Sequence, residues 1–147
     1  MSYLPICMNV TKAKIAVIGG GKAAEQKLAT LLLYAENVVV CAPEINAAIR
    51  AMPVMLLQQV YTEEVLEGVR IAYACTNQKQ LNRQIAADAR RRNILVCVAD
   101  DPEECDFISP AVYRNGDMSV AVSSNATNVR RSVAWRNTIA KLLDDGD

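Results

Sequence analysis

The sequence predicts an α/β fold, a doubly wound parallel sheet followed by a small β-hairpin and a helix. Short apolar segments alternate with amphipathic ones over residues 14–98, the order expected for parallel strands joined by crossover helices. The first strand runs directly into a glycine-rich turn and a helix. Of the 147 residues, 52% are hydrophobic, which is enough to build the core of one compact domain.

The glycine turn after the first predicted strand, Lys14 to Ile18, fits the pattern G-x-G-x-x-(G/A). Its members are Gly19, Gly21 and Ala24. The first glycine permits a tight turn, the second lets a phosphate approach the backbone, and the alanine lets the helix pack close to the strand. The helix N-terminus then offers free N–H groups to an anion. The sequence therefore predicts a Rossmann-type dinucleotide site.

The following elements continue the alternation of strands and helices. The strand near residue 40 is a continuous valine run, which is typical of a sheet covered on both faces. The predicted elements are a helix over 22–34, a strand over 37–41, a helix from Pro43-Glu44 to 52, a strand over 54–61, a short helix capped by Thr62-Glu63-Glu64, a strand over 69–75, a helix over 77–92 and a strand over 94–98.

The pattern changes near Asp106. Residues 107–113 and 118–123 read as two β segments joined by 114–117, in which Asn115-Gly116 favours a hairpin. A final helix is predicted over 127–143, with residues 144–147 frayed. We therefore predict a dinucleotide-binding domain over 1–106 and a hairpin-and-helix unit over 107–147. Because that unit is too small to fold alone, we expect it to pack on a second copy.

Charge and composition exclude several classes of function. Sixteen basic and sixteen acidic residues leave no net charge, which argues against a general binder of nucleic acid or membrane surfaces. No apolar run reaches the roughly 18 residues of a membrane helix, and no signal peptide is evident, so we expect a cytoplasmic protein. The absence of histidine excludes a Ser-His-Asp triad, a Cys-His pair and histidine metal ligands.

The five cysteines are odd in number and form no C-x-x-C pair. Three of them lie in or at the ends of predicted buried strands, so we interpret them as reduced core residues. A thiolate metal site assembled from distant strand ends is the alternative, and nothing in the spacing supports it. The cysteines are Cys7, Cys41, Cys75, Cys97 and Cys105.

Several segments, taken in order along nearly the whole chain, carry a family resemblance: Tyr3-Leu4-Pro5-Ile6, Val17-Ile18-Gly19-Gly20-Gly21 with Ala24-Glu25 and Lys27, Cys41-Ala42-Pro43-Glu44, Ala74-Cys75-Thr76-Asn77 with Leu81-Asn82, Ile94 to Pro102, Phe107-Ile108-Ser109-Pro110-Ala111, and Val120-Ala121-Val122-Ser123-Ser124. Together they resemble the precorrin-2 dehydrogenase family, the N-terminal part of sirohaem synthases. The resemblance implies NAD-dependent oxidation of precorrin-2, a tetrapyrrole, to sirohydrochlorin on the route to sirohaem. Some members also insert ferrous iron or another divalent metal. It further implies a homodimer formed by the region after the Rossmann domain.

The resemblance also implies a set of cofactor-binding residues. The dinucleotide loop would comprise Gly19, Gly20, Gly21, Lys22 and Ala23. Many Rossmann domains have an acid at the tip of the second strand to bind the ribose.

In this chain that tip is Cys41, followed by Pro43 and Glu44, so the expected preference for NAD rests on the resemblance and on Glu44. Glu44 is equally well explained as a residue at a helix N-terminus. Thr76 and Asn77, after the fourth strand, would line the cleft, although Asn77 is also a candidate helix cap.

Asp100 matches the family aspartate that is proposed to act in oxidation and chelation. Removal of a hydride from the macrocycle requires loss of a proton, and a carboxylate at a strand's carboxyl end is suited to accept it. The segment Asp100-Asp101-Pro102 is also a typical turn. With the resemblance, we favour the catalytic role for Asp100 and the turn role for Asp101.

Ser124 matches a family serine beside the tetrapyrrole pocket and is also a candidate N-cap. The family usually continues with two glycines, where this chain has Asn125 and Ala126. Arg130 and Arg131 would compensate by meeting the substrate's carboxylates, or they form a solvated or dimer-facing helix start. Family members usually extend into a further helical domain over the substrate, so we expect a complete dinucleotide site and a partial tetrapyrrole site.

Two classes of function follow. The first is an NAD-dependent dehydrogenase, with chelatase activity as a further option, which the retained Asp100 favours. The second is a non-catalytic relative that binds a dinucleotide or a tetrapyrrole, which the missing helical domain favours. A ligand-sensing Rossmann domain of the kind attached to ion transporters is disfavoured by Phe107-Ile108-Ser109-Pro110 and by the terminal hairpin and helix.

Overall fold

The computed structural model describes residues 1–146, which form two compact units. The sheet unit spans Ile6–Phe107. The hairpin unit combines Met1–Pro5 with the chain from Ile108 onward. The first five residues thus group with the C-terminal segment, where the backbone N–H of Tyr3 donates to Oδ1 of Asn125 at 3.2 Å. The domain division after residue 106 stays a prediction.

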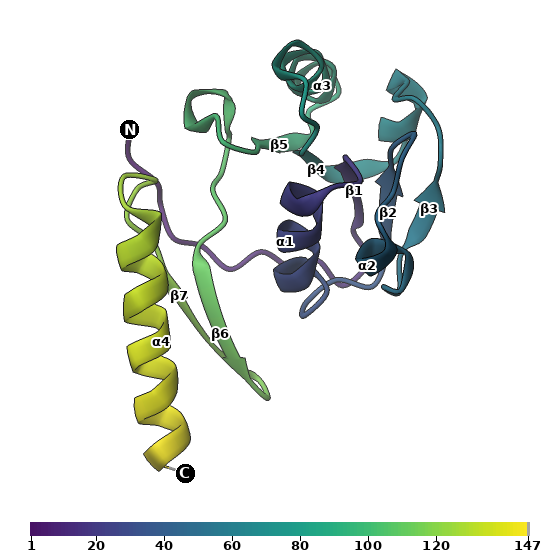
Figure 1. The fold of residues 1–147 in the computed structure, drawn as a ribbon. Coiled ribbons are helices and arrows are strands. Elements are labelled where there is room, and N and C mark those ends of the chain that lie inside the picture. Colours follow the sequence, from purple (N-terminus) through teal and green to yellow (C-terminus); the bar gives the residue numbers. More distant parts are fainter. Residues whose placement is uncertain (147) are drawn as a thin grey trace. The chain divides into compact units, whose positions relative to one another are not determined.

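The sheet unit is built on five parallel strands in the order β3-β2-β1-β4-β5. The direction of winding reverses between β1 and β4, so the carboxyl ends of these two strands flank the crevice where such folds bind ligands. The predicted α/β fold is confirmed (Figure 1). The strands are β1 (Lys14–Ile18), β2 (Val38–Cys41), β3 (Met55–Leu57), β4 (Val69–Ala74) and β5 (Leu95–Val98).

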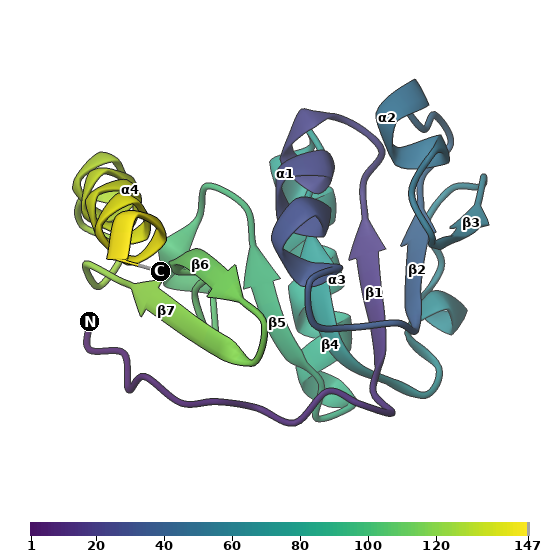
Figure 2. The same cartoon turned by 90° about the horizontal axis from the view of Figure 1, so that it is seen from below.

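Helices cover both faces of this sheet, which explains its continuous apolar strands. On one face α1 (Lys22–Leu31) and α2 (Ala47–Arg50) contribute Leu28 and Ile49 to the core. On the other, α3 (Lys79–Arg91) contributes Ile85, and the 3₁₀ segment η1 (Glu63–Leu66) contributes Leu66. All four of these side chains are at most 1% exposed. Figure 2 shows α1 and α3 on opposite sides of the strands.

Several elements are shorter than the sequence predicts. Helix α1 ends at Leu31 rather than Tyr34, because the next residues tighten into turns. Helix α2 begins at Ala47 rather than Pro43, because Oδ1 of Asn46 accepts the N–H of Ile49 and starts the helix there. Strand β3 keeps three of the residues predicted over 54–61. Helix α3 follows Gln78, so the predicted cap at residue 77 is wrong.

The hairpin unit consists of β6 (Ala111–Asn115), β7 (Met118–Val122) and α4 (Val129–Gly146). The predicted hairpin is confirmed, but the pairing of Asn115 with Met118 makes Gly116-Asp117 the turn. Helix α4 starts two residues later than predicted and continues through 144–146, where we expected fraying; residue 147 lies outside the described residues. Within residues 1–146, no helix is both long and apolar enough to cross a membrane.

Candidate dinucleotide site and active site

Gly19, directly after β1, is fixed between two neighbouring strand ends. Its N–H donates to the carbonyl oxygen of Cys41 at 2.9 Å. Its φ of +137° lies in a region that side chains rarely adopt, and a Cβ would overlap the carbonyl oxygen of Cys75. The tight turn that the sequence predicted here therefore requires glycine for two independent reasons.

Gly20 and Gly21 differ in what surrounds them. A Cβ on Gly20 would overlap the carbonyl oxygen of Glu44, and the Gly20 carbonyl accepts the N–H of Asn46 at 2.9 Å. A Cβ on Gly21, by contrast, would have no surrounding described residue within 4 Å. Gly21 is the N-cap of α1 and, having no side chain, provides no side-chain cap for the N–H groups there. Open space beside uncapped N–H groups fits a pyrophosphate.

A polar network ties this loop to the start of α2. Nδ2 of Asn46 donates to one carboxylate oxygen of Glu25 at 3.1 Å, and Nζ of Lys22 lies 3.3 Å from the other. Asn46 therefore supports the loop through both its backbone and its side chain. Asn46 was not among the site residues predicted from the sequence, although an asparagine three positions before the buried Ile49 is a local capping signal.

The segment after β2 divides into buried and exposed residues. Cys41 is fully buried, its Sγ lies 3.6 Å from the carbonyl oxygen of Gln59, and burial raises the pKa of its thiol. The Cys41 side chain thus belongs to the core. Pro43 and Glu44 are exposed at the same edge as the glycine loop. Because α2 begins at residue 47, Glu44 is not in a helical first turn, and that alternative is wrong.

The loop after β4 is held by an asparagine from α3. Oδ1 of Asn82 accepts both the N–H of Thr76 at 3.1 Å and its hydroxyl at 2.6 Å, while Nδ2 donates to the Thr76 carbonyl at 3.0 Å. Asn82 is only 5% exposed. Asn77 is exposed beside this anchored residue. A polar residue on the apolar face of a helix was the available signal for Asn82.

Asp100 is exposed, follows β5, and has a φ of +61°. The N–H of Asp101 donates to the Val98 carbonyl at 3.3 Å, so the segment is a turn as well as a candidate site. Left-handed backbone at a residue other than glycine is uncommon and often marks functional sites. The glycine loop, Thr76 and Asp100 follow β1, β4 and β5, so they share one edge of the sheet, with β5 about 10 Å from β1.

Ser124 and Arg130 belong to the hairpin unit. Oγ of Ser124 accepts the N–H of Asn128 at 2.9 Å, so the serine caps the turn that precedes α4. Within that turn Asn125 and Ala126 have φ values of +53° and +62°. Asn128 itself accepts the N–H of Arg131 at 3.0 Å and starts the helix. Arg130 is exposed in the first helical turn.

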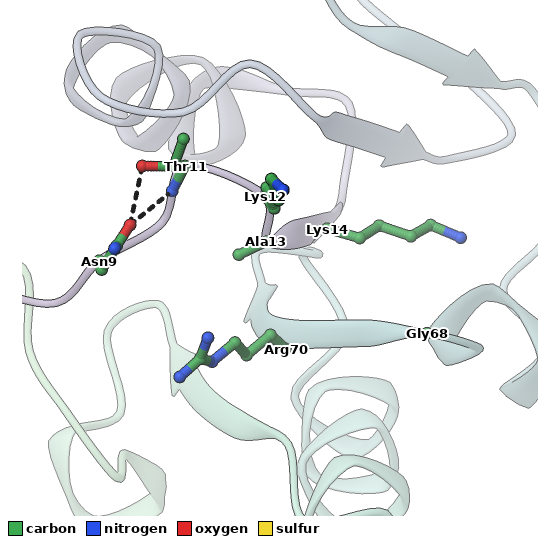
Figure 3. Close-up of a pocket in the computed structure, with 7 residues that line it drawn as sticks. All are labelled: Asn9, Thr11, Lys12, Ala13, Lys14, Gly68 and Arg70. Atoms are coloured by element: carbon green, nitrogen blue, oxygen red, sulfur yellow. Dashed lines mark hydrogen bonds between the residues drawn. The ribbon is translucent and has the colours of Figure 1, made fainter.

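A further hollow of about 650 Å³ lies at the opposite, amino edge of the sheet. Its lining includes three cationic side chains, but Figure 3 shows Lys14 and Arg70 pointing in opposite directions. Nζ of Lys14 donates to the Glu67 carbonyl at 3.0 Å. These charges do not converge, so this hollow is not a candidate anion site. It is lined by Asn9, Thr11, Lys12, Ala13, Lys14, Gly68 and Arg70.

Comparisons with known proteins agree with this arrangement. The family model described as "Putative NAD(P)-binding" matches residues 6–111, which confirms the predicted NAD-type cofactor. A siroheme synthase of Psychromonas ingrahamii is 35% identical over 84% of this chain and 27% of its own length. One of Chromobacterium violaceum is 34% identical over 99% of this chain and 32% of its own length.

A solved structure of "SirC, precorrin-2 dehydrogenase" superimposes with a TM-score of 0.83 at 18% sequence identity, covering 95% of this chain and 70% of that one. At this identity the match supports the fold alone. The chain spans about a third of the length of the curated relatives that it matches.

Proposed function

The chain belongs to the family that contains the siroheme synthases and precorrin-2 dehydrogenase, and from this premise we propose that it oxidises precorrin-2 to sirohydrochlorin with NAD, on the route to sirohaem. The observation that carries the proposal is the pairing of two features at one sheet edge. A glycine loop with open space at Gly21 adjoins the crevice, and the exposed carboxylate of Asp100 stands two strands away.

Each part of this edge has a task in the proposed reaction. When bound, NAD supplies the acceptor for a hydride. The uncapped N–H groups after Gly21 bind its pyrophosphate, and Asn46 and Asn82 hold the two flanking loops in position. Asp100 accepts the proton that the macrocycle loses as its new double bond forms. Because the carboxylate is exposed, that proton then passes to water.

The hairpin unit supplies the proposed substrate contacts and the dimer surface. The Ser124 hydroxyl oxygen accepts from Asn128, which leaves its hydrogen for a substrate carboxylate, and the exposed Arg130 offers a guanidinium to the same groups. Trp135 and Leu142, seven residues apart on one face of α4, are 55% and 68% exposed, and this face is suited to the predicted homodimer. The cytoplasmic location also stays a prediction.

The exposed Glu44 supports a preference for NAD over NADP, because its carboxylate would repel a 2′-phosphate. Glu44→Ala should therefore narrow the ratio of NADP to NAD dissociation constants by about tenfold, or ~1.4 kcal/mol. Glu67→Ala is the matched control, since Glu67 is also exposed but precedes β4 at the opposite edge. An unchanged ratio in Glu44→Ala would remove this residue from the cofactor site.

The decisive experiment is anaerobic incubation with precorrin-2 and NAD, following sirohydrochlorin by absorbance and NAD binding by calorimetry. Asp100→Asn should lower kcat by about 10²-fold or more while the NAD dissociation constant stays unchanged. Asp101→Asn, one residue away in the same turn, should stay within a few fold. Adding ferrous iron to sirohydrochlorin then tests the chelatase activity that some family members have.

A non-catalytic binding protein is the alternative that the same experiment separates. It would bind NAD or the tetrapyrrole without turnover and would be indifferent to Asp100→Asn. If calorimetry detects no NAD binding, the proposed NAD site is wrong for the dehydrogenase and for the binding protein alike. Turnover that survives in Asp100→Asn would retain the dehydrogenase and reject the assigned role of the carboxylate.

A further inference from the structure

Two cysteines approach each other at the carboxyl end of β5. Cys97 lies within the strand and is 3% exposed, whereas Cys105 follows the 3₁₀ segment η2 (Pro102–Glu104) and is half-buried. Their Sγ atoms are 3.9 Å apart, and both thiols are free. A disulfide has an S–S distance of about 2.05 Å, so the sulfurs must close by roughly 2 Å, which side-chain rotation on the partly exposed loop can supply.

The sulfur of Cys105 is held in place by its own segment. The backbone N–H of Val98 donates to it at 3.1 Å, and the carbonyl oxygens of Val98 and Asp101 lie 3.2 and 3.3 Å away. These contacts keep the sulfur over the end of β5 and next to Cys97. These contacts fold residues 97–105 back on themselves. This segment includes Asp100, which has a left-handed backbone conformation.

The surroundings distinguish the two thiols chemically. Hydrogen bonding from Cys97 lowers the pKa of Cys105, as do the Val98 N–H and the positive charge of Lys27, against the opposing effects of burial and Asp101. The same thiol–thiol hydrogen bond, together with burial, raises the pKa of Cys97. Cys105 is therefore the thiol that more readily becomes a nucleophilic thiolate, and Cys97 remains protonated beside it.

We propose that Cys97 and Cys105 are a redox-modification site that a peroxide converts to an intramolecular disulfide. The Cys105 thiolate attacks the peroxide O–O bond, so that an S–O bond forms and hydroxide leaves. The Cys97 sulfur then attacks the resulting sulfenic acid, the S–S bond forms, and the S–O bond breaks as water leaves. The proton of Cys97 leaves with the sulfenic oxygen in that water, and the hydroxide takes up the proton that Cys105 released on becoming a thiolate. The two thiols together lose two electrons, and hydrogen peroxide is reduced to two waters.

The disulfide would close residues 97–105 into a covalent ring that contains Asp100. This proposal is independent of the dehydrogenase activity, because it concerns the chemistry of the thiols themselves. Its readout is also independent, because a single tryptic peptide, residues 93–114, contains both cysteines and no others.

The test treats the whole chain with hydrogen peroxide, alkylates the remaining thiols with N-ethylmaleimide in urea, and analyses that peptide by mass spectrometry. We expect the doubly alkylated peptide to fall by about tenfold and an unlabelled form, lighter by two hydrogen atoms than the dithiol, to replace it. Dithiothreitol added before alkylation should restore both labels. Cys7→Ser, which removes an exposed cysteine outside the pair, should behave like the parent protein.

Single substitutions within the pair assign the two roles. In Cys97→Ser, dimedone should trap a sulfenic acid on Cys105, because the resolving thiol is absent. In Cys105→Ser, the buried Cys97 should remain reduced and alkylatable. The proposal is overturned if the 93–114 peptide keeps both thiols at a peroxide dose that oxidises Cys7, or if Cys105 is found joined to another cysteine or to a second chain.

Discussion

Each unit contains a turn that precedes a helix and has residues with a positive φ. The two turns achieve this backbone conformation with different residue types. Before α1, Gly19 has a φ of +137°, and the turn packs so closely that a side chain on Gly19 or Gly20 would overlap a backbone carbonyl. Before α4, Asn125 and Ala126 have φ values of +53° and +62°, which L residues reach at a cost of about 1–2 kcal/mol each.

The difference separates two uses of glycine. In the sheet unit glycine is required by packing, because neighbouring strand ends and the loop before α2 leave no room for a Cβ. In the hairpin unit the backbone angle is the special feature, and Asn125 and Ala126 adopt it with side chains present. The family resemblance implies two glycines where this chain has Asn125 and Ala126, and both of these residues have a positive φ, which glycine adopts most readily.

Gly20→Ala should have the largest effect, because it places a side chain against the Glu44 carbonyl, which is backbone and cannot rotate away. We expect a loss of about 3 kcal/mol in the free energy of unfolding, measured by urea denaturation followed by circular dichroism. Gly21→Ala, one residue along in open space, is the matched control. A Gly20→Ala protein within 1 kcal/mol of the parent would show that packing does not impose this glycine.

Asn82→Leu should have the second-largest effect on stability. It extends the comparison to the loop after β4, which lies at the same edge and contains no glycine. Leucine keeps the volume of the side chain but leaves the N–H and the carbonyl of Thr76 without the partner they have now. The expected loss is about 2 kcal/mol in the free energy of unfolding. Gln80→Leu, at an exposed site on the same helix, should change it by no more than about 0.5 kcal/mol. Equal effects in the two variants would mean that Asn82 does not anchor the loop.

Gly21→Ala should leave the fold intact and weaken the ligand instead. Its Cβ would meet no described residue within 4 Å, yet it would occupy space at the uncapped N-terminus of α1. We expect a free energy of unfolding within about 1 kcal/mol of the parent's. By calorimetry, we expect the NAD dissociation constant to be about tenfold larger, a loss of about 1.4 kcal/mol in binding free energy. Unchanged NAD affinity would indicate that the pyrophosphate does not lie against this residue.

Local sequence patterns predicted the parts of this fold that depend on local physics. The bounds of β1 follow directly from an apolar run that ends at Gly19, and the alternation of elements gave the parallel sheet. The predicted start of α2 was wrong because Pro43 resembles a first-turn residue. The hydrogen bonds of Asn46 with Ile49 and Glu25 decide where the helix begins.

The residues that support the candidate site were harder to predict, because their partners are distant or depend on backbone angle. The contact between the Cys97 and Cys105 sulfurs depends on a 3₁₀ turn that folds the chain back over β5. Asp100 was identified only through the family resemblance, since its residue type and its neighbours also describe an ordinary turn. Its left-handed φ is visible only in the structure.

Ala126→Gly should have the smallest effect and the opposite sign. It relieves about 1–2 kcal/mol of left-handed strain, while the greater freedom of glycine in the unfolded chain costs about 0.5–1 kcal/mol, for a net gain near 0.5–1 kcal/mol. Trp135, the one tryptophan of the chain, lies on α4, so its fluorescence in urea follows the hairpin unit. Ala134→Gly, at an exposed position in α4, should destabilise by about 1 kcal/mol. If both variants destabilise equally, the turn before α4 carries no strain for glycine to relieve, and the proposed equivalence of Asn125-Ala126 to a glycine pair fails.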